Sequence, residues 1–436
     1  MKRTRLRNGL VGFLVVAVVL ALAVLLGLFR PSTVAPGVQE PLTDAQTREL
    51  LPRGRELALA GNCMGCHSLP QGPGGAGGVP IDTPFGTLYS SNITPDKTYG
   101  IGKYTREDFH RVLRDGIAPG NRNLYPGMPF VFTHITRPED IDALYAYIMS
   151  LPSVAEPNVA NTGVFRLPVR PFMNFWALIN FPDRQPPARE GASEQWLRGA
   201  YLVEGLGHCG ACHTPRNVTM GVSFARSLEG GDVVDGLVVP DITANTLAKR
   251  GFSTASLSEY LRSGISAQGT AFGSMYTVTH FSTSAMQATD VEAIASYLMT
   301  GKDGQLLTPA KGPEPLPSAS DTALQRGRLS YMSACAGCHG TEGEGIPNVA
   351  PPMNGNIAVI MASPVNLLTV ILQGVPTQTF TGNQRMYAMP GFADRMSAEE
   401  VAGLASWMRA QWGGQGKIIT AEQVEAIAPV KKTKTD

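Results

Sequence analysis

The sequence predicts a mostly α-helical chain in which one N-terminal transmembrane helix precedes three tandem domains. Two observations support this architecture. A Cys-x-x-Cys-His pattern occurs three times and accounts for all six cysteines, and an uncharged, apolar stretch lies near the N-terminus. Because 436 residues exceed what one hydrophobic core normally organises, we expect each copy of the pattern to belong to its own small domain.

The apolar stretch covers residues 9–29 and is about long enough to cross a bilayer as a helix. Four basic residues precede it between positions 2 and 7, whereas only Arg30 follows closely, so the positive-inside rule exports the rest of the chain. A cleaved signal peptide is the alternative, with Ala21-Leu-Ala23 as cleavage site, but apolar residues continue to Phe29. We therefore expect residues 1–35 to form a cytoplasmic N-terminus and a retained anchor, with the domains in the periplasm.

The repeated pentapeptide is the attachment signature of a c-type haem. Two cysteines three residues apart project from one side of a helical turn, so both can form thioethers with one porphyrin while the adjacent histidine reaches the iron. Zinc and dithiol sites also use Cys-x-x-Cys and remain the alternatives, but neither requires that histidine in every copy. We expect three covalent haems, attached at Cys63-Met-Gly-Cys66-His67, Cys209-Gly-Ala-Cys212-His213 and Cys335-Ala-Gly-Cys338-His339.

Each pentapeptide lies between a glycine-containing segment and a later closing segment whose apolar residues recur at helical spacing. The glycine lets the first helix approach another backbone closely, and an aromatic residue of the closing helix can fill the crossing. The predicted pairs are Gly54 with Tyr147, Gly199 with Tyr297, and Gly327 with Trp407. We expect domains over residues 45–155, 191–303 and 320–412, an interdomain linker over 156–190 and a C-terminal tail over 413–436.

The order of glycine-containing helix, pentapeptide, methionine loop and closing helix resembles the class I cytochrome c fold in all three domains. Further segments resemble the triheme cytochrome c subunits of bacterial membrane-bound alcohol, aldehyde and sugar-acid dehydrogenases, and the resemblance covers roughly residues 48–412. These segments are Ser91–Asp96, Gly100–Gly102, Leu124–Pro129, Cys212–Asn217 and Met389–Phe392.

The resemblance implies an electron-transfer subunit on the bacterial inner membrane, with its haem domains facing the periplasm. Its electron donor would be a dehydrogenase catalytic subunit of molybdopterin, PQQ or flavin type, with or without a small subunit, and its acceptor would be ubiquinone. Several alcohol-dehydrogenase-type members reach the membrane through apolar C-terminal segments, whereas this chain ends in the polar stretch Lys431–Asp436. That departure narrowly favours an aldehyde-type partner over an alcohol or sugar-acid type.

The sixth iron ligand separates an electron carrier from a haem enzyme, because methionine closes the distal position and raises the potential. Met128, Met275 and Met389 lie between each pentapeptide and its closing helix, in irregular segments rich in glycine and proline, and are the predicted ligands. The alternates are Met286 and Met386, and His134 or His280 would give bis-histidine ligation instead. With methionine ligands we expect outer-sphere electron transfer and no substrate-oxidising site in this chain.

Two other functions stay open at this point: a peroxidase-like haem enzyme, and a cytochrome subunit that feeds a terminal oxidase. The balance of 36 basic and 35 acidic residues, without a basic patch, argues against nucleic acid and favours proteins and lipid as partners. The apolar, aromatic residues 171–181 between the first two domains are expected to pack between domains, with a lipid or quinone surface as the sharper hypothesis.

Overall fold

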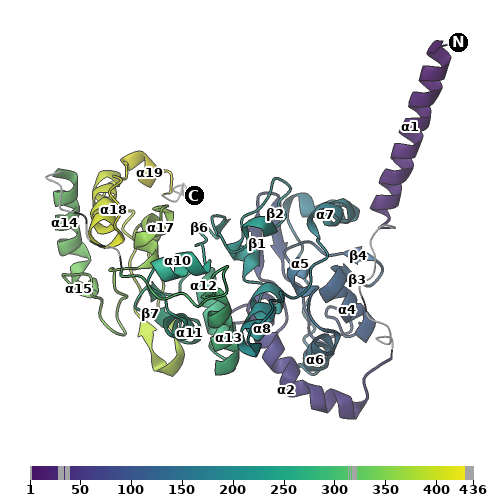
Figure 1. Ribbon diagram of the computed structural model, residues 1–436, viewed down its shortest axis with the longest axis horizontal. Helices are drawn as coiled ribbons and strands as arrows, with labels where there is room; N and C mark the ends of the chain where they lie inside the picture. Colours follow the sequence, from purple (N-terminus) through teal and green to yellow (C-terminus); the bar gives the residue numbers. More distant parts are fainter. Residues whose placement is uncertain are drawn as a thin grey trace, which may run out of the picture. The chain divides into compact units, whose positions relative to one another are not determined.

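The computed structural model describes residues 2–27, 34, 40–312, 314, 316 and 322–427. The end of the predicted anchor at Phe29, the following Arg30 and the polar stretch Lys431–Asp436 lie outside these residues. The described part is mostly helical, as the sequence predicted (Figure 1). Each of its sheets consists of two short antiparallel strands.

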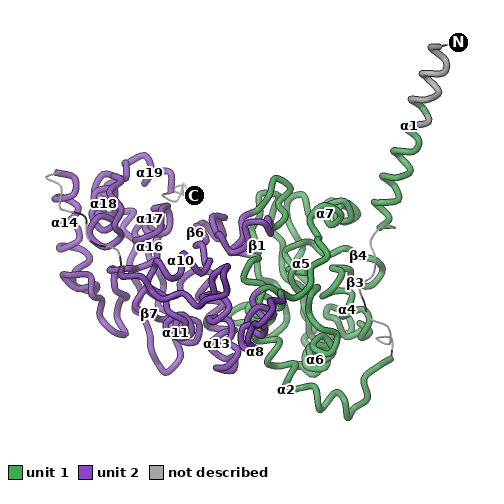
Figure 2. The backbone as a smooth tube through the Cα atoms, viewed as in Figure 1, with its two compact units in different colours: residues 1–187, 204–211, 216–222 green, residues 188–203, 212–215, 223–436 purple. Residues whose placement is uncertain are grey.

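The chain forms two compact units (Figure 2). The first comprises residues 1–187, 204–211 and 216–222, and the second comprises residues 188–203, 212–215 and 223–436. The first unit contains the first glycine-containing helix and its closing helix, and the second unit contains the other two such pairs. The finer domain boundaries expected from the sequence stay predictions.

The chain up to residue 187 begins with the N-terminal helix α1, whose described side chains are largely apolar and exposed from Val11 to Leu22. Within the described residues, no helix reaches the combination of length and hydropathy that a membrane span requires. The elements are α1 (Lys2–Leu25), α2 (Asp44–Ala60), α3 (Cys63–His67), β1 (Pro80–Thr83), β2 (Gly86–Tyr89), α4 (Arg106–Asp115), β3 (Ile117–Ala118), β4 (Arg122–Asn123), α5 (Phe130–Thr133), α6 (Pro138–Met149), η1 (Gly163–Arg166), η2 (Arg170–Phe172) and α7 (Met173–Asn180).

The next part of the chain, up to residue 303, repeats the pattern of an opening helix, a pentapeptide helix and a closing helix. Its elements are α8 (Glu194–Tyr201), η3 (Leu202–Leu206), α9 (Gly210–His213), η4 (Phe224–Arg226), β5 (Val233–Val234), β6 (Leu237–Val238), α10 (Ala244–Lys249), α11 (Thr254–Ser263), β7 (Ile265–Ser266), β8 (Gly269–Thr270), α12 (Ser274–Val278), η5 (Thr279–Thr283) and α13 (Ala288–Leu298).

The last part of the chain shows the pattern a third time and encloses a core around Tyr331, Trp407 and Trp412, whose rings meet at centroid distances of 4.9–5.1 Å. Its elements are α14 (Thr322–Ala334), α15 (Ala336–His339), α16 (Ile357–Ile360), α17 (Val365–Gln373), β9 (Gln378–Thr379), η6 (Thr381–Asn383), β10 (Arg385–Met386), α18 (Ala398–Gly413) and α19 (Ala421–Glu425).

The predicted glycine–aromatic crossings are confirmed in all three repeats, where α2 packs on α6, α8 on α13, and α14 on α18 (Figure 1). A Cβ atom added to Gly54 would lie 2.7 Å from Tyr147 Cβ, and one added to Gly199 would lie 2.9 Å from Tyr297 Cβ. The corresponding distance from Gly327 to Trp407 Cβ is also 2.9 Å. Real side chains do not approach so closely, so each crossing requires glycine.

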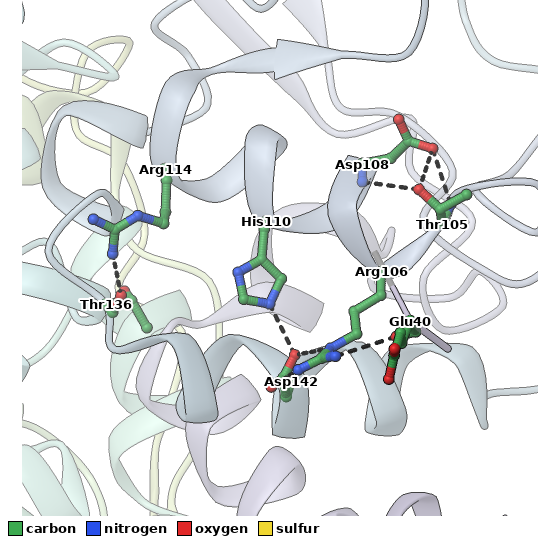
Figure 3. Close-up of polar contacts among 8 residues, drawn as sticks. All are labelled: Glu40, Thr105, Arg106, Asp108, His110, Arg114, Thr136 and Asp142. Carbon is green, nitrogen blue, oxygen red and sulfur yellow. Dashed lines mark hydrogen bonds and ion pairs between the residues drawn. The ribbon is translucent and has the colours of Figure 1, made fainter. Parts of the chain in front are cut away.

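A partly buried ion pair and a hydrogen bond join α4 to the closing helix α6 in the first unit. The Arg106 guanidinium contacts both carboxylate oxygens of Asp142 at 2.5 Å, and His110 Nε2 lies 2.8 Å from Asp142 Oδ1. Figure 3 shows the Arg106 and His110 side chains reaching from α4 to Asp142 on α6, with Glu40 beside Arg106. The Glu40 carbonyl accepts a further hydrogen bond from Arg106. This bond links the segment before α2 to the same cluster of side chains.

Candidate haem attachment sites

The three pentapeptides fold as short helical segments, α3, α9 and α15. In each copy the first cysteine is half-buried and the second is exposed, and all six thiols are free of disulfides. The same pattern of exposure therefore occurs at all three sites. Each site offers two thiols and one imidazole within a single helical turn, which is the donor set that a c-type haem requires.

Each pentapeptide histidine directs Nδ1 at a main-chain carbonyl oxygen. The acceptor of His67 is Ser91 at 2.7 Å, that of His213 is Pro240 at 2.8 Å, and that of His339 is Pro351 at 2.9 Å. A carbonyl carries no proton, so Nδ1 must be the protonated nitrogen and must donate. The neutral ring then presents Nε2 with its lone pair free for iron, which is the arrangement typical of metal-binding histidines.

These acceptors lie far along the chain from the histidines that they bind. They follow their histidines by 24, 27 and 12 residues. In the first two sites a repeated Asn/Asp-Ile-Thr tripeptide follows the acceptor. Its first side chain accepts hydrogen bonds from the threonine main chain and hydroxyl at 2.7–2.9 Å. This tripeptide repeat is visible in the sequence and is the feature that could have located the carbonyl acceptors of the first two sites.

Burial keeps the ligand groups in the protonation states that fit this chemistry. Burial lowers the pKa of His67, His213 and His339, so their imidazoles stay neutral and can act as ligands. Burial, followed by the charge of the partner cysteine, raises the pKa of Cys63 to about 12 and that of Cys335 to about 11. These two thiols are therefore protonated at neutral pH.

The three candidate methionine ligands occupy comparable positions. Met128, Met275 and Met389 are each half-buried, whereas the alternates Met286 and Met386 are 7% and 8% exposed. Met275 lies in the helix α12, so the expectation of an irregular segment is wrong for this methionine. Met389 is held by reciprocal main-chain hydrogen bonds with Val375 at 2.9 and 3.0 Å. Pairing of each methionine with its histidine stays a prediction.

The remaining candidate histidines have other partners. Both ring nitrogens of the buried His134 are engaged, Nδ1 with Val131 O at 3.0 Å and Nε2 with the Arg184 main-chain N–H at 3.1 Å. This occupancy disfavours His134 as a distal ligand. His280 is exposed and stacks on Tyr276.

The aromatic piece between the first two predicted domains divides into an inner and an outer face. Trp176 packs edge-on against Phe130 at a centroid distance of 6.2 Å and donates its indole N–H to Thr219 O at 3.0 Å, which supports a packing role. Phe172, Leu178 and Ile179 are 56%, 59% and 69% exposed and form the outer face. Asn174 donates to Leu25 O at 2.8 Å, so α7 contacts the end of α1.

Comparisons with known proteins agree with this site chemistry. The family model "Cytochrome c" matches residues 51–152, and the model "Cytochrome C oxidase, cbb3-type, subunit III" matches residues 322–408. The chain is 34% identical over 410 residues to the cytochrome c subunit of alcohol dehydrogenase (quinone) of Gluconacetobacter polyoxogenes, covering 88% of this chain and 86% of the relative. Identity to the gluconate 2-dehydrogenase cytochrome c subunit of Pantoea cypripedii is 35% over 410 residues, with 88% and 91% coverage.

A third relative is a subunit of the nicotinate dehydrogenase of Pseudomonas putida, which is 37% identical over 404 residues. The alignment covers 90% of this chain but 33% of the relative, so this chain spans about a third of that protein's length.

Proposed function

Because the chain belongs to the family of cytochrome c subunits of dehydrogenase complexes, we propose that it carries three haems c and passes electrons from a dehydrogenase subunit to ubiquinone. One observation, repeated at all three sites, carries this proposal. A main-chain carbonyl orients the histidine of each Cys-x-x-Cys-His motif, and Nε2 is left as the ligand atom. When bound, haem c supplies reversible one-electron chemistry at iron. The protein contributes attachment, orientation and the environment that sets the potential.

The number of haems is tested on the full-length protein purified with its prosthetic groups. We expect three haems per chain to remain bound after denaturation and extraction with acidic acetone, because thioether bonds survive that treatment. Replacing one pentapeptide histidine and both its cysteines with alanine, at one site at a time, should remove one haem of the three. A chain that loses all colour on extraction would contradict covalent attachment.

We assign the axial ligands to Met128, Met275 and Met389. A thioether ligand gives ferric haem a weak far-red absorption band and raises the reduction potential. Replacing each methionine with leucine should remove about one third of that band, because three sites contribute to it in this proposal. Met286→Leu is the matched control, since Met286 is a buried methionine of the same chain.

The proposal also names the protein that donates electrons to this chain and the molecule that accepts them. The sequence narrowly favours an aldehyde dehydrogenase subunit as donor, while the relatives carry the names of alcohol, gluconate and nicotinate dehydrogenases. Gentle purification from membranes identifies the companion subunit, and reduction of a ubiquinone analogue is then measured with acetaldehyde, ethanol, gluconate and nicotinate. Reduction of the haems by one substrate, without reduction of the quinone, would contradict ubiquinone as the acceptor.

We place the chain at the bacterial inner membrane, anchored by the N-terminal helix, with the haem sites in the periplasm. The exposed apolar side chains of α1 support this location, because such side chains are favourable in lipid and unfavourable in water. Alkaline washing of membranes tests it: an anchored protein stays in the pellet, whereas a peripheral one is released.

A second candidate function is delivery of electrons to a terminal oxidase, and the match of residues 322–408 to an oxidase subunit model favours it. The ligands would be the same and the partner would differ. Co-purification with an oxidase, and haem oxidation that requires that oxidase, would support this candidate over quinone reduction. A peroxidase-like enzyme would instead need an open iron, which rapid carbon monoxide binding by the intact ferrous protein would reveal.

A further inference from the structure

Tyr276 follows Met275, the proposed ligand of the second haem, and its hydroxyl bonds to a distant part of the same compact unit. The hydroxyl donates to Thr379 O at 2.9 Å and accepts from Thr379 N–H at 3.3 Å. Thr379 ends β9, which pairs with β10 in a hairpin of the last repeat. A residue beside one proposed ligand is therefore hydrogen-bonded to the main chain of the next repeat.

Aromatic rings also hold the Tyr276 ring in place. His280 stacks on it at a centroid distance of 5.2 Å, and Phe380 meets it edge-on at 5.5 Å with an interplanar angle of 87°. Gly264 makes room for the Phe380 ring, because a Cβ atom on Gly264 would lie 2.6 Å from Phe380 Cδ1. Gly264 also has φ +75°, so this position suits glycine for two independent reasons.

The hairpin that binds Tyr276 leads directly to the proposed ligand of the third haem. Arg385 pairs with Thr379 across the hairpin, and Met389 follows three residues after Met386, the last residue of β10. Met389 is itself held by main-chain hydrogen bonds to Val375, which precedes β9. The Tyr276 contacts thus join α12, which carries Met275, to the hairpin that leads to Met389.

We propose that Tyr276 and Phe380 are positioning residues that hold α12, and with it Met275, and thereby set the reduction potential of the second haem. This inference rests on the proposed function, in which Met275 is an iron ligand. A thioether is a soft ligand that favours ferrous iron and raises the potential. The strength of its bond to iron depends on how firmly α12 keeps the sulfur in place, so loosening α12 should lower the potential.

The variants Tyr276→Phe, Tyr276→Leu and Phe380→Leu test the proposal in the full-length holoprotein. Tyr276→Phe removes only the hydroxyl bonds, whereas the leucine variants also remove ring contacts. Tyr387→Phe is the matched control, because Tyr387 follows the same hairpin but is 50% exposed and its hydroxyl accepts from Arg385. Haem content and thermal unfolding verify that each variant folds.

The measurement is a spectroelectrochemical titration that follows the haem potentials and the far-red methionine band. In Tyr276→Phe we expect the reduction potential of one haem to fall by about 59 mV. For a one-electron couple this corresponds to a roughly tenfold change in the reduction equilibrium. The two leucine variants should show a larger fall and lose up to about a third of the far-red band. Tyr387→Phe should keep the wild-type potentials.

Unchanged potentials and an intact band in both Tyr276→Leu and Phe380→Leu would overturn the proposal, as would an equal shift in Tyr387→Phe. Met275→Leu separates this failure from failure of the ligand assignment. If Met275→Leu removes part of the far-red band while the Tyr276 and Phe380 variants change nothing, only the positioning role is wrong. If the band survives Met275→Leu, the ligand assignment fails and the inference fails with it.

Discussion

At the scale of single residues, the hydrogen bond to Nδ1 distinguishes the predicted ligand histidines from histidines whose Nε2 is already engaged by the protein. His67, His213 and His339 each have Nδ1 bound to a carbonyl, which leaves Nε2 for iron. His134 has both nitrogens engaged by the chain, and His110 Nε2 is bound to Asp142. All five histidines lie in a helix or at its end, so their hydrogen-bond partners, together with the preceding Cys-x-x-Cys, separate the two groups.

His134 should make stability depend on pH. Burial and the Arg184 guanidinium lower its pKa from 6.5 to about 4, so the folded state favours the neutral ring. The resulting stabilisation is complete above pH 6.5 and is lost as the pH falls toward about 4. We expect a loss of up to roughly 3 kcal/mol over that range. Thermal unfolding of the holoprotein followed by circular dichroism measures it.

His134→Gln is the comparison, because glutamine also offers a donor and an acceptor but does not titrate between pH 4 and 6.5. Its stability should be lower at neutral pH and should depend less on pH across this interval. Parallel pH profiles of stability for the two proteins would show that His134 does not contribute to the pH dependence.

At the scale of elements, the three helix crossings are the most regular feature of the chain. In the first two repeats the arginine before the glycine also pairs with an aspartate at the start of the closing helix. Arg53 contacts Asp140 at 2.9 and 3.2 Å, and Arg198 contacts Asp290 at 2.8 and 2.7 Å. The crossing therefore combines close backbone contact with a bidentate ion pair, which also sets the register of the two helices.

Gly54→Ala should destabilise the first crossing. The new methyl group would meet the Ala143 carbonyl and Tyr147 Cβ, neither of which can move without displacing α6. We expect a loss of about 3 kcal/mol, at the upper end of the usual cost of overpacking. Gly74→Ala is the control, because a Cβ atom there has no neighbour within 4 Å. Equal unfolding temperatures for the two variants would contradict the packing role of Gly54.

Asp142 should stabilise the contact between α4 and α6 at neutral pH. Burial alone would raise its pKa, but hydrogen bonds from Arg106 and His110 lower it overall. The charged carboxylate therefore stabilises the fold above the ordinary aspartate pKa of about 3.9, and this contribution is lost as the pH falls through the lower folded value. Asp142→Asn should cost about 3 kcal/mol at pH 7, because it leaves Arg106 without its buried partner.

Acid unfolding provides the measurement for Asp142. The difference in stability between wild type and Asp142→Asn should shrink as the pH is lowered through the aspartate range, since protonation neutralises the same carboxylate. A difference that stays constant down to acid denaturation would show that the charge of Asp142 is not what stabilises the contact.

At the scale of the whole molecule, two apolar surfaces of the first unit remain exposed: the described side chains of α1 and the outer face of α7, formed by Phe172, Leu178 and Ile179. Contiguous exposed apolar residues commonly mark a membrane or partner surface. Asn174 links α7 to the end of α1, so the two surfaces are adjacent in the chain's fold. Both are available to lipid in the proposed location.

Replacing residues 1–35 with a cleavable secretion signal tests the contribution of α1 to membrane binding. We expect the shortened protein to retain its haems and to appear mainly in the soluble periplasmic fraction, because the apolar helix is gone. The double variant Leu178→Glu/Ile179→Glu in the shortened protein measures the remaining contribution of α7. A shortened protein that stays wholly in the membrane, with or without the glutamates, would contradict anchoring by α1.

The sequence by itself determined the features that depend on covalent chemistry and short spacing. The six cysteines and their adjacent histidines were recognisable as predicted haem sites because attachment of a c-type haem requires these residues within one turn. The glycine–aromatic pairs were recognisable because they recur three times. Helix periodicity was enough to predict the closing helices, which the structure confirms.

Only the tertiary structure decided which distant groups meet these local features. The carbonyls of Ser91, Pro240 and Pro351, the Arg184 main chain beside His134, and Thr379 beside Tyr276 all lie far along the chain from the side chains they bind. Main-chain carbonyls and amides occur at nearly every residue, so residue type alone cannot select one as a partner. Folding selects it by bringing a particular peptide group within hydrogen-bonding distance.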